Sequence, residues 1–500
     1  MACLAAGAIP SLGQARPFSF EKLVQQAKTL SQGSYTDGAP PRSEKILEQI
    51  DYDAFGKISF RPECSLEVGP SKIPVRLFHL QRYAKKPVGI HLVEKGQSRE
   101  VLYSPDFFEM PKDSPAAQLP KDIGFAGFRV LDKGKEADWM AFMGAAYFRT
   151  SGELNQFGLS ARALAVDTAM AGPEEFPRFT NFYFAPSESG VLTIYALMDS
   201  PSVTGAVRFD VNRPKGIVMT ISSCFFARKD IKRMGLAPLT SMFWFSEYSR
   251  RLATDWRPEI HDSDGLAIWT GSGERLWRPL NNPPRVMTSS FVDNHVKGFG
   301  LAQRDREFGH YEDDGVFYNK RSTCWVEPLG DWGAGCVQLV EIPTDDEIYD
   351  NIVSYWVPEK PVKAGDKIAI DYRLYWVKDE PFPAPVGRVF SSRVGAGGVP
   401  GQTRPQGVVK FVIDFEGGQL SQFGRGDGIE AVVSASKGTI DGTYCLPVVG
   451  TNRWRAFFDL APTSLDPIEL RLYLRRKGIA LTETWLSQFH PTAAAKVAKK

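Results

Sequence analysis

The sequence has few histidines and no long apolar segment, and each absence excludes a class of function. The 500 residues include only 6 histidines, and none of them shows the HxxxH, HExxH or HxH spacing that holds zinc. No GxSxG elbow, phosphate loop or GxGxxG strand-to-helix turn occurs either. We therefore expect no metal and no cofactor. No stretch reaches the roughly 18 consecutive apolar residues of a membrane span, so we expect no membrane insertion.

Charge bias is also missing. Lys and Arg number 60 and Asp and Glu 58, and the two signs are interspersed along the chain. This balance argues against nucleic acid or an anionic membrane as a partner. Of the 6 cysteines, Cys3 lies in an apolar N-terminal run, which leaves an odd number without metal-ligand spacing. We expect buried thiols, with a Cys324–Cys336 disulfide as the alternative.

The N-terminus resembles the end of a secretory signal. Small and apolar residues lead to Gly13-Gln14-Ala15, a small-x-small cleavage site, although no charged segment precedes them. We expect residues 1–15 to be a truncated signal peptide that is cleaved after Ala15. The mature protein should then be secreted and soluble.

The rest of the chain is typical of a mostly β protein. Gly (45) and Pro (35) are frequent, which suits short strands joined by turns. Apolar residues at helical spacing after Ser19 and again after Ser43 predict two short helices. The predicted strands are 191–198, 206–211, 217–227, 337–342 and 367–377, and then 408–415, 429–436, 454–460 and 468–474.

These patterns predict two domains. We expect a large antiparallel β-sandwich over 16–380, because strand patterns with turn punctuation fill most of that segment. The Pro- and Gly-rich segment 381–407 is predicted to be a linker. Regular short strands over 408–490 favour a small immunoglobulin-like β-sandwich. Residues 491–500 should form a disordered tail.

Acids, aromatics and arginines are concentrated between Trp256 and Trp356. Paired carboxylates can act as the acid and base of glycoside hydrolysis, and aromatic faces can stack on sugar rings. Each element also has a plain structural interpretation. Asp262-Ser-Asp-Gly265 is good turn chemistry, and most of the tryptophans could be core. Composition alone therefore only favours a sugar-binding β protein.

Longer sequence motifs are more specific than composition. Six such motifs occur in this chain: His261-Asp-Ser-Asp-Gly-Leu266, Trp277-Arg-Pro-Leu-Asn-Asn282, Lys297-Gly-Phe-Gly-Leu301, Trp325-Val-Glu-Pro328, Gly330-Asp-Trp-Gly333 and Glu341-Ile-Pro-Thr-Asp-Asp-Glu-Ile-Tyr-Asp-Asn-Ile-Val353. They resemble the osmoregulated periplasmic glucan biosynthesis proteins of the OpgG/OpgD (MdoG/MdoD) family, from Phe18 to about Trp485. The string Tyr372-Arg-Leu-Tyr-Trp376 is more like the D branch than the G branch.

The resemblance implies a periplasmic protein that sets the backbone structure of β-1,2-linked glucans, as an anomer-inverting endo-β-1,2-glucanase. It places the general acid on Asp350 and the general base on Asp262, with Asp264 as a second candidate for the base. It also implies a twin-arginine export signal, but no Arg-Arg pair precedes the apolar run.

The sequence also predicts substrate contacts and leaves more than one class of function open. We expect Asp264, Trp269, Trp277, Arg278, Trp332 and Tyr355 to bind the glucan. A cyclising β-1,2-glucan transglycosylase and a non-catalytic glucan-binding scaffold are the alternative functions. A homodimer is also compatible with the sequence.

Overall fold

The computed structural model describes residues 11–37, 41–144, 146–187 and 190–491. The chain divides into two compact units. The first unit comprises 1–239, 326–335 and 355–377, and the second comprises 240–325, 336–354 and 378–500. Four strands run across the points where the chain passes from one unit to the other: β17 (Met234–Ser241), β24 (Thr323–Leu329), β25 (Ala334–Glu341) and β26 (Ile352–Pro358).

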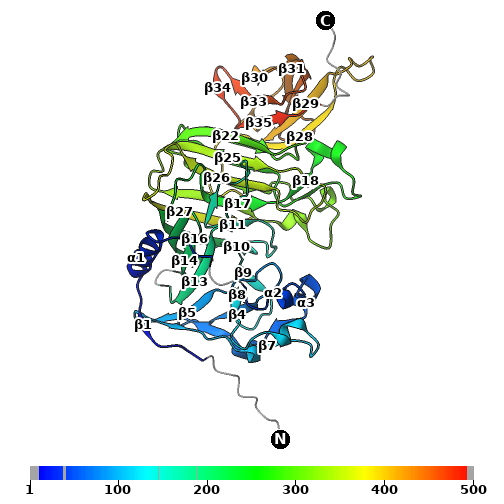
Figure 1. Cartoon of the computed structure of the whole chain (residues 1–500). Coiled ribbons are helices and arrows are strands. Elements are labelled where there is room, and N and C mark those ends of the chain that lie inside the picture. The colour runs from blue at the N-terminus through cyan, green and yellow to red at the C-terminus, as the bar shows by residue number, and fades with distance from the viewer. Residues whose placement is uncertain (1–10, 38–40, 145, 188–189, 492–500) are drawn as a thin grey trace. The chain divides into compact units, whose positions relative to one another are not determined.

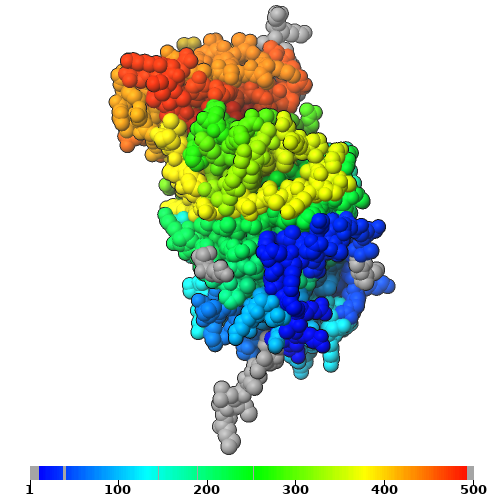
Figure 2. Space-filling view, turned by 90° about the vertical axis from the view of Figure 1, so that its left-hand side faces the viewer, coloured from blue at the N-terminus to red at the C-terminus, as the bar shows by residue number. Residues whose placement is uncertain are grey.

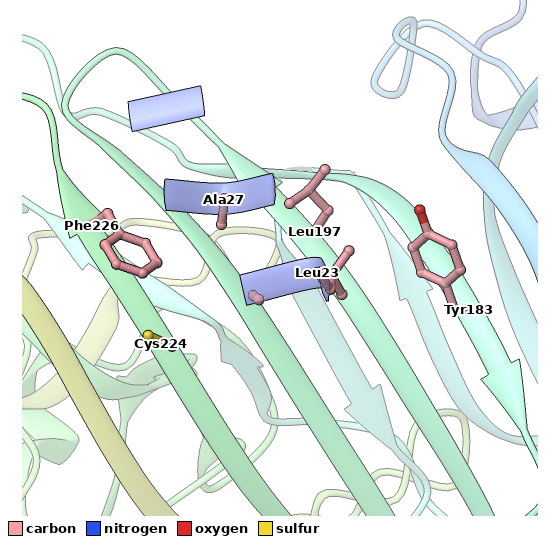
Figure 3. Close-up of a cluster of buried hydrophobic side chains, with 7 residues drawn as sticks. Leu23, Ala27, Tyr183, Leu197, Cys224 and Phe226 are labelled. Atoms are coloured by element: carbon pink, nitrogen blue, oxygen red, sulfur yellow. The ribbon is translucent and has the colours of Figure 1, made fainter. Parts of the chain in front are cut away.

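The predicted helices lie in the first unit. Helix α1 (Phe20–Ser31) begins after Ser19, whose hydroxyl accepts a hydrogen bond from the backbone N–H of Lys22. Its buried residues Leu23 and Ala27 pack on the strands behind it, as Figure 3 shows. The second predicted helix is short: α2 (Glu44–Leu47) is followed by α3 (Tyr52–Gly56). Both predictions of a helix are confirmed.

Two sheets of the first unit pack face to face. One sheet runs in the order β1 (Arg16–Pro17), β6 (Gln97–Glu100), β5 (Gly89–Glu94), β13 (Arg178–Ala185), β14 (Leu192–Asp199), β15 (Val203–Asn212), β16 (Ile217–Ala227) and β27 (Lys367–Val377). The other includes β11 (Ser160–Arg162), β10 (Tyr147–Thr150), β9 (Asp138–Met143), β8 (Phe125–Leu131), β4 (Ile73–His79) and β3 (Leu66–Val68). Minor strands are β2 (Ser59–Phe60), β7 (Phe108–Glu109) and β12 (Leu164–Val166). Phe142 of β9 and Phe209 of β15 meet with ring centroids 5.2 Å apart, so the core lies between the sheets. Helix α1 covers β14, β15 and β16 (Figure 1).

The end of the predicted signal pairs with the edge of the first sheet. Leu12 bridges Val101, the N–H of Gly13 donates to the carbonyl of Glu100 at 2.8 Å, and Arg16 lies opposite Ser98. Cleavage after Ala15 would remove the first half of this pairing. Residues 1–10 lie outside the described chain.

The second unit is also built from strands. One stretch of a 16-stranded sheet has the order β23 (Gly298–Ala302), β20 (Gly265–Trp269), β21 (Arg275–Pro279), β35 (Thr484–Phe489), β33 (Ile468–Arg476) and β30 (Ile429–Ala435). A second sheet has the order β28 (Arg388–Ala396), β29 (Val409–Glu416), β32 (Arg453–Ala461) and β31 (Thr439–Pro447). Shorter elements are β18 (Phe243–Phe245), the 3₁₀ helix η4 (Glu247–Leu252), β19 (Ile260–His261), β22 (Met287–Asn294), the 3₁₀ helix η6 (Tyr318–Lys320) and β34 (Ile479–Ala480). Strand β20 pairs antiparallel with β21 and β23, whereas β21 pairs in parallel with β35, where Trp277 lies beside Trp485.

The C-terminal strands form a two-sheet sandwich, drawn as the orange and red block in Figure 2. Phe411 of β29 contacts Trp485 of β35 from the facing sheet, with ring centroids 6.1 Å apart. The predicted linker 381–407 contains β28, the first strand of this sandwich. The pairing of β35 with β21 continues one sheet into the 265–302 segment. The compact second unit therefore extends well to the N-terminal side of 381.

The predicted fold class is confirmed, since the chain is mostly β and its sheets are largely antiparallel. No disulfide joins the described cysteines, so Cys324 and Cys336 do not form the alternative pair. Among the described residues, none of the helices has the length and hydropathy needed to cross a bilayer.

Candidate active site

Asp262 comes directly after β19. Its backbone N–H donates to the carbonyl of Met242 at 2.9 Å, which fixes the chain after the short β18–β19 pair. The carboxylate is buried, with 7% exposure, and its Oδ1 lies 2.8 Å from Nε of Arg321. An opposite charge at this distance stabilises the ionised carboxylate.

Asp264 has a different environment two residues later. Its carboxylate accepts hydrogen bonds from the backbone N–H groups of Arg304 and Asp305, each at 2.7 Å. Burial raises the pKa of Asp264 to about 6, although the charge of His261 and the two backbone bonds oppose the shift. Asp264 therefore anchors the start of the 304–322 loop.

Gly265 ends the motif for a packing reason. It lies in β20, and a Cβ there would fall 2.3 Å from the indole ring of Trp277 on the neighbouring strand. Its backbone does not have the positive φ that a turn glycine would need. Close approach to Trp277 thus explains this glycine better than turn chemistry does.

His261 lies between Asp262 and a buried polar network. Its Nδ1 is 3.0 Å from Oε1 of Gln303 and its Nε2 is 3.0 Å from Oε2 of Glu259. Burial by itself would lower the pKa of His261, but the hydrogen bond to Glu259 and the charges of Asp264 and Glu259 raise it. Both ring nitrogens face oxygen acceptors, which suits an imidazolium that donates from both.

Asp350 is exposed on the loop between β25 and β26. The next residue, Asn351, is buried and closes the loop. Its Oδ1 accepts from the N–H of Phe243 at 2.8 Å, and its Nδ2 donates to the carbonyls of Phe243 and Ile342, each at 2.9 Å. In the Asp-Asn-Ile-Val motif, Asn351 therefore fixes the loop that presents Asp350.

Glu347 ties the same loop to two other segments. Arg257 donates to both of its carboxylate oxygens at 3.0 Å and also contacts Asp313 at 2.5 Å. The hydroxyl of Tyr318 donates to Oε2 of Glu347. Arginine in this bidentate geometry fixes orientation as well as distance.

We call Arg257, Glu347 and Tyr318 the Glu347 clamp. Tyr318 connects this clamp to Asp262. Burial, the bond to Glu347 and the charge of Asp262 together raise the pKa of Tyr318 well above its usual value. The guanidinium of Arg321, which pairs with Asp262, lies 5.1 Å from the centre of the Tyr318 ring. A continuous path of contacts thus runs from Glu347 through Tyr318 and Arg321 to Asp262, all within the second unit.

Three other predicted contact residues also belong to the second unit. Trp269 is partly buried and carries the Arg275 guanidinium 3.8 Å from its ring centre. Trp277 is buried under Arg304, whose guanidinium is 3.7 Å from the ring. Arg278 is buried and its NH2 donates to Glu341 at 3.1 Å. The side chains of Trp277 and Arg278 thus pack in the interior of the second unit.

The remaining two predicted contacts, Trp332 and Tyr355, belong to the first unit. The indole N–H of Trp332 donates to the carbonyl of Asp371 at 3.3 Å. Tyr355 is fully buried with its ring against Gly235, and burial raises its pKa to about 12. Its ring therefore presents no face to solvent.

Residues that sequence reasoning missed complete the site region. Arg304 is buried and bonds both Glu380, at 2.6 Å, and Glu483, at 2.6 Å. Trp256 is 71% exposed, which is unusual for a tryptophan. Trp256 was visible in the acid- and aromatic-rich segment, whereas no local pattern predicts a partner such as Glu483, 179 residues from Arg304.

One group could hold a cation. Single ligand atoms of Glu259, Asp305 and His310 lie within 4.8 Å of one another. His310 Nδ1 is already 2.6 Å from Asp305, and Glu259 bonds His261. These direct contacts satisfy the group without an ion.

Comparison with known proteins agrees with the resemblance over nearly the whole chain. The family model "Periplasmic glucan biosynthesis protein, MdoG" matches residues 18–489. "Glucans biosynthesis protein D 2" of Ralstonia nicotianae is 51% identical over 496 residues, which cover 96% of this chain and 92% of the relative. "Probable glucans biosynthesis protein D" of Shewanella oneidensis is 46% identical, over 98% of this chain and 92% of the relative. "Glucans biosynthesis protein D" of Stenotrophomonas maltophilia is 46% identical, over 97% and 92%. The chain belongs to the MdoG family of periplasmic glucan biosynthesis proteins.

Proposed function

We propose that this chain acts in the periplasm as an anomer-inverting endo-β-1,2-glucanase that sets the backbone structure of osmoregulated glucans. Asp350 would be the general acid and Asp262 the general base. The observation that carries the proposal is the path of contacts from the Asp350 loop, through Glu347 and Tyr318, to the Arg321–Asp262 pair. It ties the loop that carries Asp350 to Asp262, which lies far away in the sequence.

The environment of Asp262 suits a base. In an inverting reaction one carboxylate draws a proton from water while water attacks the anomeric carbon. The Arg321 guanidinium lies 2.8 Å from Asp262, and an opposite charge at that distance favours the ionised carboxylate that this role needs. Asp264 serves instead as an acceptor for two backbone N–H groups, which makes Asp262 the better candidate of the two.

Binding of the substrate would favour the protonated form of the Asp350 carboxyl. In the unliganded chain it is exposed to water. A glucan lying over the loop would exclude that water and favour the neutral carboxyl, and the acids Asp345 and Asp346, close to Asp350 in the sequence, would add repulsion against a further negative charge. A protonated Asp350 could then donate to the departing glycosidic oxygen.

Exposed aromatics next to this loop would hold the sugar. Trp256 is 71% and Tyr349 is 57% exposed. Arg257, adjacent to Trp256, bonds Glu347, which lies two residues before Tyr349, so the two aromatic residues sit on loops that are tied together. Flat aromatic faces beside hydroxyl-bonding groups are a common platform for pyranose rings.

The test is hydrolysis of linear β-1,2-glucan by Asp350→Asn and Asp262→Asn variants. We expect each to lose about 10²- to 10⁴-fold in kcat, the range for a general acid or base, while glucan binding persists. Asp314→Asn, an exposed acid on the neighbouring 304–322 loop, is the control and should keep full activity. NMR of the fresh products should show the α-anomer.

Other outcomes separate the alternatives. Cyclic products would mean transglycosylation, in which a sugar hydroxyl replaces water. Unchanged glucan processing by Asp350→Asn would overturn the assigned acid and leave the binding scaffold as the better account.

A further inference from the structure

The second unit contains a cavity that the proposed reaction does not use. It has a volume of about 800 Å³ and is formed by η4, the 281–284 loop, the end of β28, the start of β29 and the end of β35. Neither Asp262 nor Asp350 lines it. We call it the arginine pocket; its lining includes Tyr248, Arg250, Arg251, Asn282, Val394, Val408, Phe489 and His490. A cavity of this size suits a small ligand.

The charge of the arginine pocket is positive. The consecutive residues Arg250 and Arg251 both line it, and among the described residues of the lining Glu247 is the one acid. Glu247 is already engaged: one oxygen accepts from the N–H of Ser392 at 2.9 Å and the other lies 3.1 Å from Arg393. Among the described lining residues, no carboxylate is therefore available as a partner for Arg250 and Arg251.

Arg251 is the more available of the two arginines. Arg250 donates to the carbonyl of Pro258 at 2.9 Å. Arg251 lies 5.7 Å from the ring centre of Phe489 and is exposed, and in the part of the chain that the structure describes its guanidinium donates to no acceptor. A guanidinium stacked on an aromatic ring keeps its N–H edge open for a carboxylate or phosphate.

Two further polar atoms of the wall lack partners. Nε2 of His490 and Oε1 of Gln488 are buried, and neither makes a hydrogen bond to any described residue. Burial and the charges of Arg278, Arg285 and Arg251 lower the pKa of His490 to about 4, so the ring is neutral near pH 7. Buried polar atoms without partners are costly, and a bound molecule that met them would offset that cost.

The floor of the pocket is apolar. Val394, Val408, Phe489 and Pro284 contribute apolar surface to the lining. We propose that the arginine pocket binds an organic anion, in which a phosphate or carboxylate group meets Arg250 and Arg251 while an apolar body covers Phe489 and the valines. This site would be separate from the proposed glucan-cleaving residues, so binding there and hydrolysis can be tested independently.

Three matched probes test the proposal on the full-length chain: phenyl phosphate, benzoate and phenyl β-glucoside, with inorganic phosphate as a fourth. Calorimetry gives the affinities, and the ring signals of the 6 histidines can be followed by NMR. We expect phenyl phosphate or benzoate to bind, to shift the His490 signals, and to weaken as salt is raised. The comparison of the two identifies which anionic group is preferred. Binding of the neutral glucoside as tight as that of both anions, or inorganic phosphate as tight as phenyl phosphate, would overturn the proposal.

Variants locate the site. Arg251→Ala should weaken the tighter anion at least tenfold, Arg251→Lys should weaken it less, and the Arg250→Ala/Arg251→Ala pair should abolish it. Arg99→Ala, an exposed arginine of the first unit, is the control and should bind normally. Both arginines of the pocket are exposed at the surface, so folding should persist, which thermal unfolding checks. Unchanged affinity in the double variant would place the anion elsewhere and refute the inference.

Discussion

The two units fill their interiors in different ways. Between the sheets of the first unit, aromatic rings pack on one another: Phe142 contacts Phe128, Phe148 and Phe209 with centroids 4.9 to 5.2 Å apart. The first unit buries few charged side chains, such as Arg76 and Arg162 at 6% exposure each. The interior of the second unit holds more of them, among them Arg278 (1%), Glu341 (0%), His261 (0%), Glu483 (3%) and Arg257 (9%).

This difference has an energetic meaning. Burying apolar rings stabilises a fold directly, whereas buried ions must recover their lost hydration from partners of good geometry. The second unit therefore holds an arrangement that stability alone would not favour. Positions where charge is kept inside at a cost are candidates for function, and Asp262 and the Glu347 clamp lie among them.

The largest expected effect comes from removing one side of a buried ion cluster. Arg304→Ala would leave Glu380 and Glu483 without their guanidinium, and breaking such a group costs about 3–5 kcal/mol. Phe142→Ala in the first unit should cost a similar amount through its cavity. Urea unfolding at pH 7 measures both.

The pH dependence of these two variants separates them. Acid protonates the stranded carboxylates of Arg304→Ala, so its deficit should shrink markedly between pH 7 and pH 5. A cavity has no charge to titrate, so the Phe142→Ala deficit should stay constant. Equal behaviour of the two variants would mean that the cluster contributes through packing alone.

The second expected effect is a gain of stability on mild acidification. Burial raises the pKa of Asp264 to about 6 and that of Glu247 to about 7. A carboxyl whose folded pKa lies above its unfolded value contributes stability that is present at low pH and is lost as pH rises through the folded pKa. Unfolding of the second unit should therefore require about 2 kcal/mol more at pH 5 than at pH 8. Glu247→Gln and Asp264→Asn should each flatten this profile, and a profile unchanged in both variants would contradict the assignment.

How far the sequence predicted this structure depends on the range of the interactions. Strands β16 and β27 have the predicted bounds, 217–227 and 367–377, because β-branched and aromatic residues fill them. The helix after Ser19 was predictable from its cap and its apolar spacing. Strand β28 was missed because Gly and Pro surround it, and its pairing with β29 is a tertiary property.

The candidate site shows the same division. Motifs drew attention to Asp262, Asp264 and Asp350, each of which lies in a distinctive string. The contacts that hold the Asp350 loop join Arg257 to Glu347 across 90 residues and Tyr318 to Glu347 across 29. Such contacts leave no periodicity or spacing in the sequence, so only the fold reveals them.

A third prediction concerns the Glu347 clamp. Glu347→Ala removes one of the acceptors of Arg257 and the acceptor of the Tyr318 hydroxyl. The Asp350 loop should then lose its fixed orientation, and kcat on β-1,2-glucan should fall about tenfold with little change in KM. Glu347→Gln, which keeps one acceptor oxygen, should recover part of the rate. Asp314→Asn, an exposed acid of the neighbouring loop, should have no effect. A tenfold rise in KM with kcat unchanged would mean that Glu347 acts in binding and does not position the acid.

The smallest effect on stability, and the sharpest contrast with the buried rings of the first unit, is expected at Trp256. Because its ring is 71% exposed, Trp256→Ala should change the free energy of unfolding by no more than about 0.5 kcal/mol. Loss of a stacking face should still raise KM for the glucan severalfold, and Trp256→Phe should restore much of the affinity. Tyr83→Ala, 73% exposed in the first unit, is the matched control for removing a surface aromatic. If Trp256→Ala and Tyr83→Ala had the same KM, the exposed ring beside the clamp would have no part in holding the sugar.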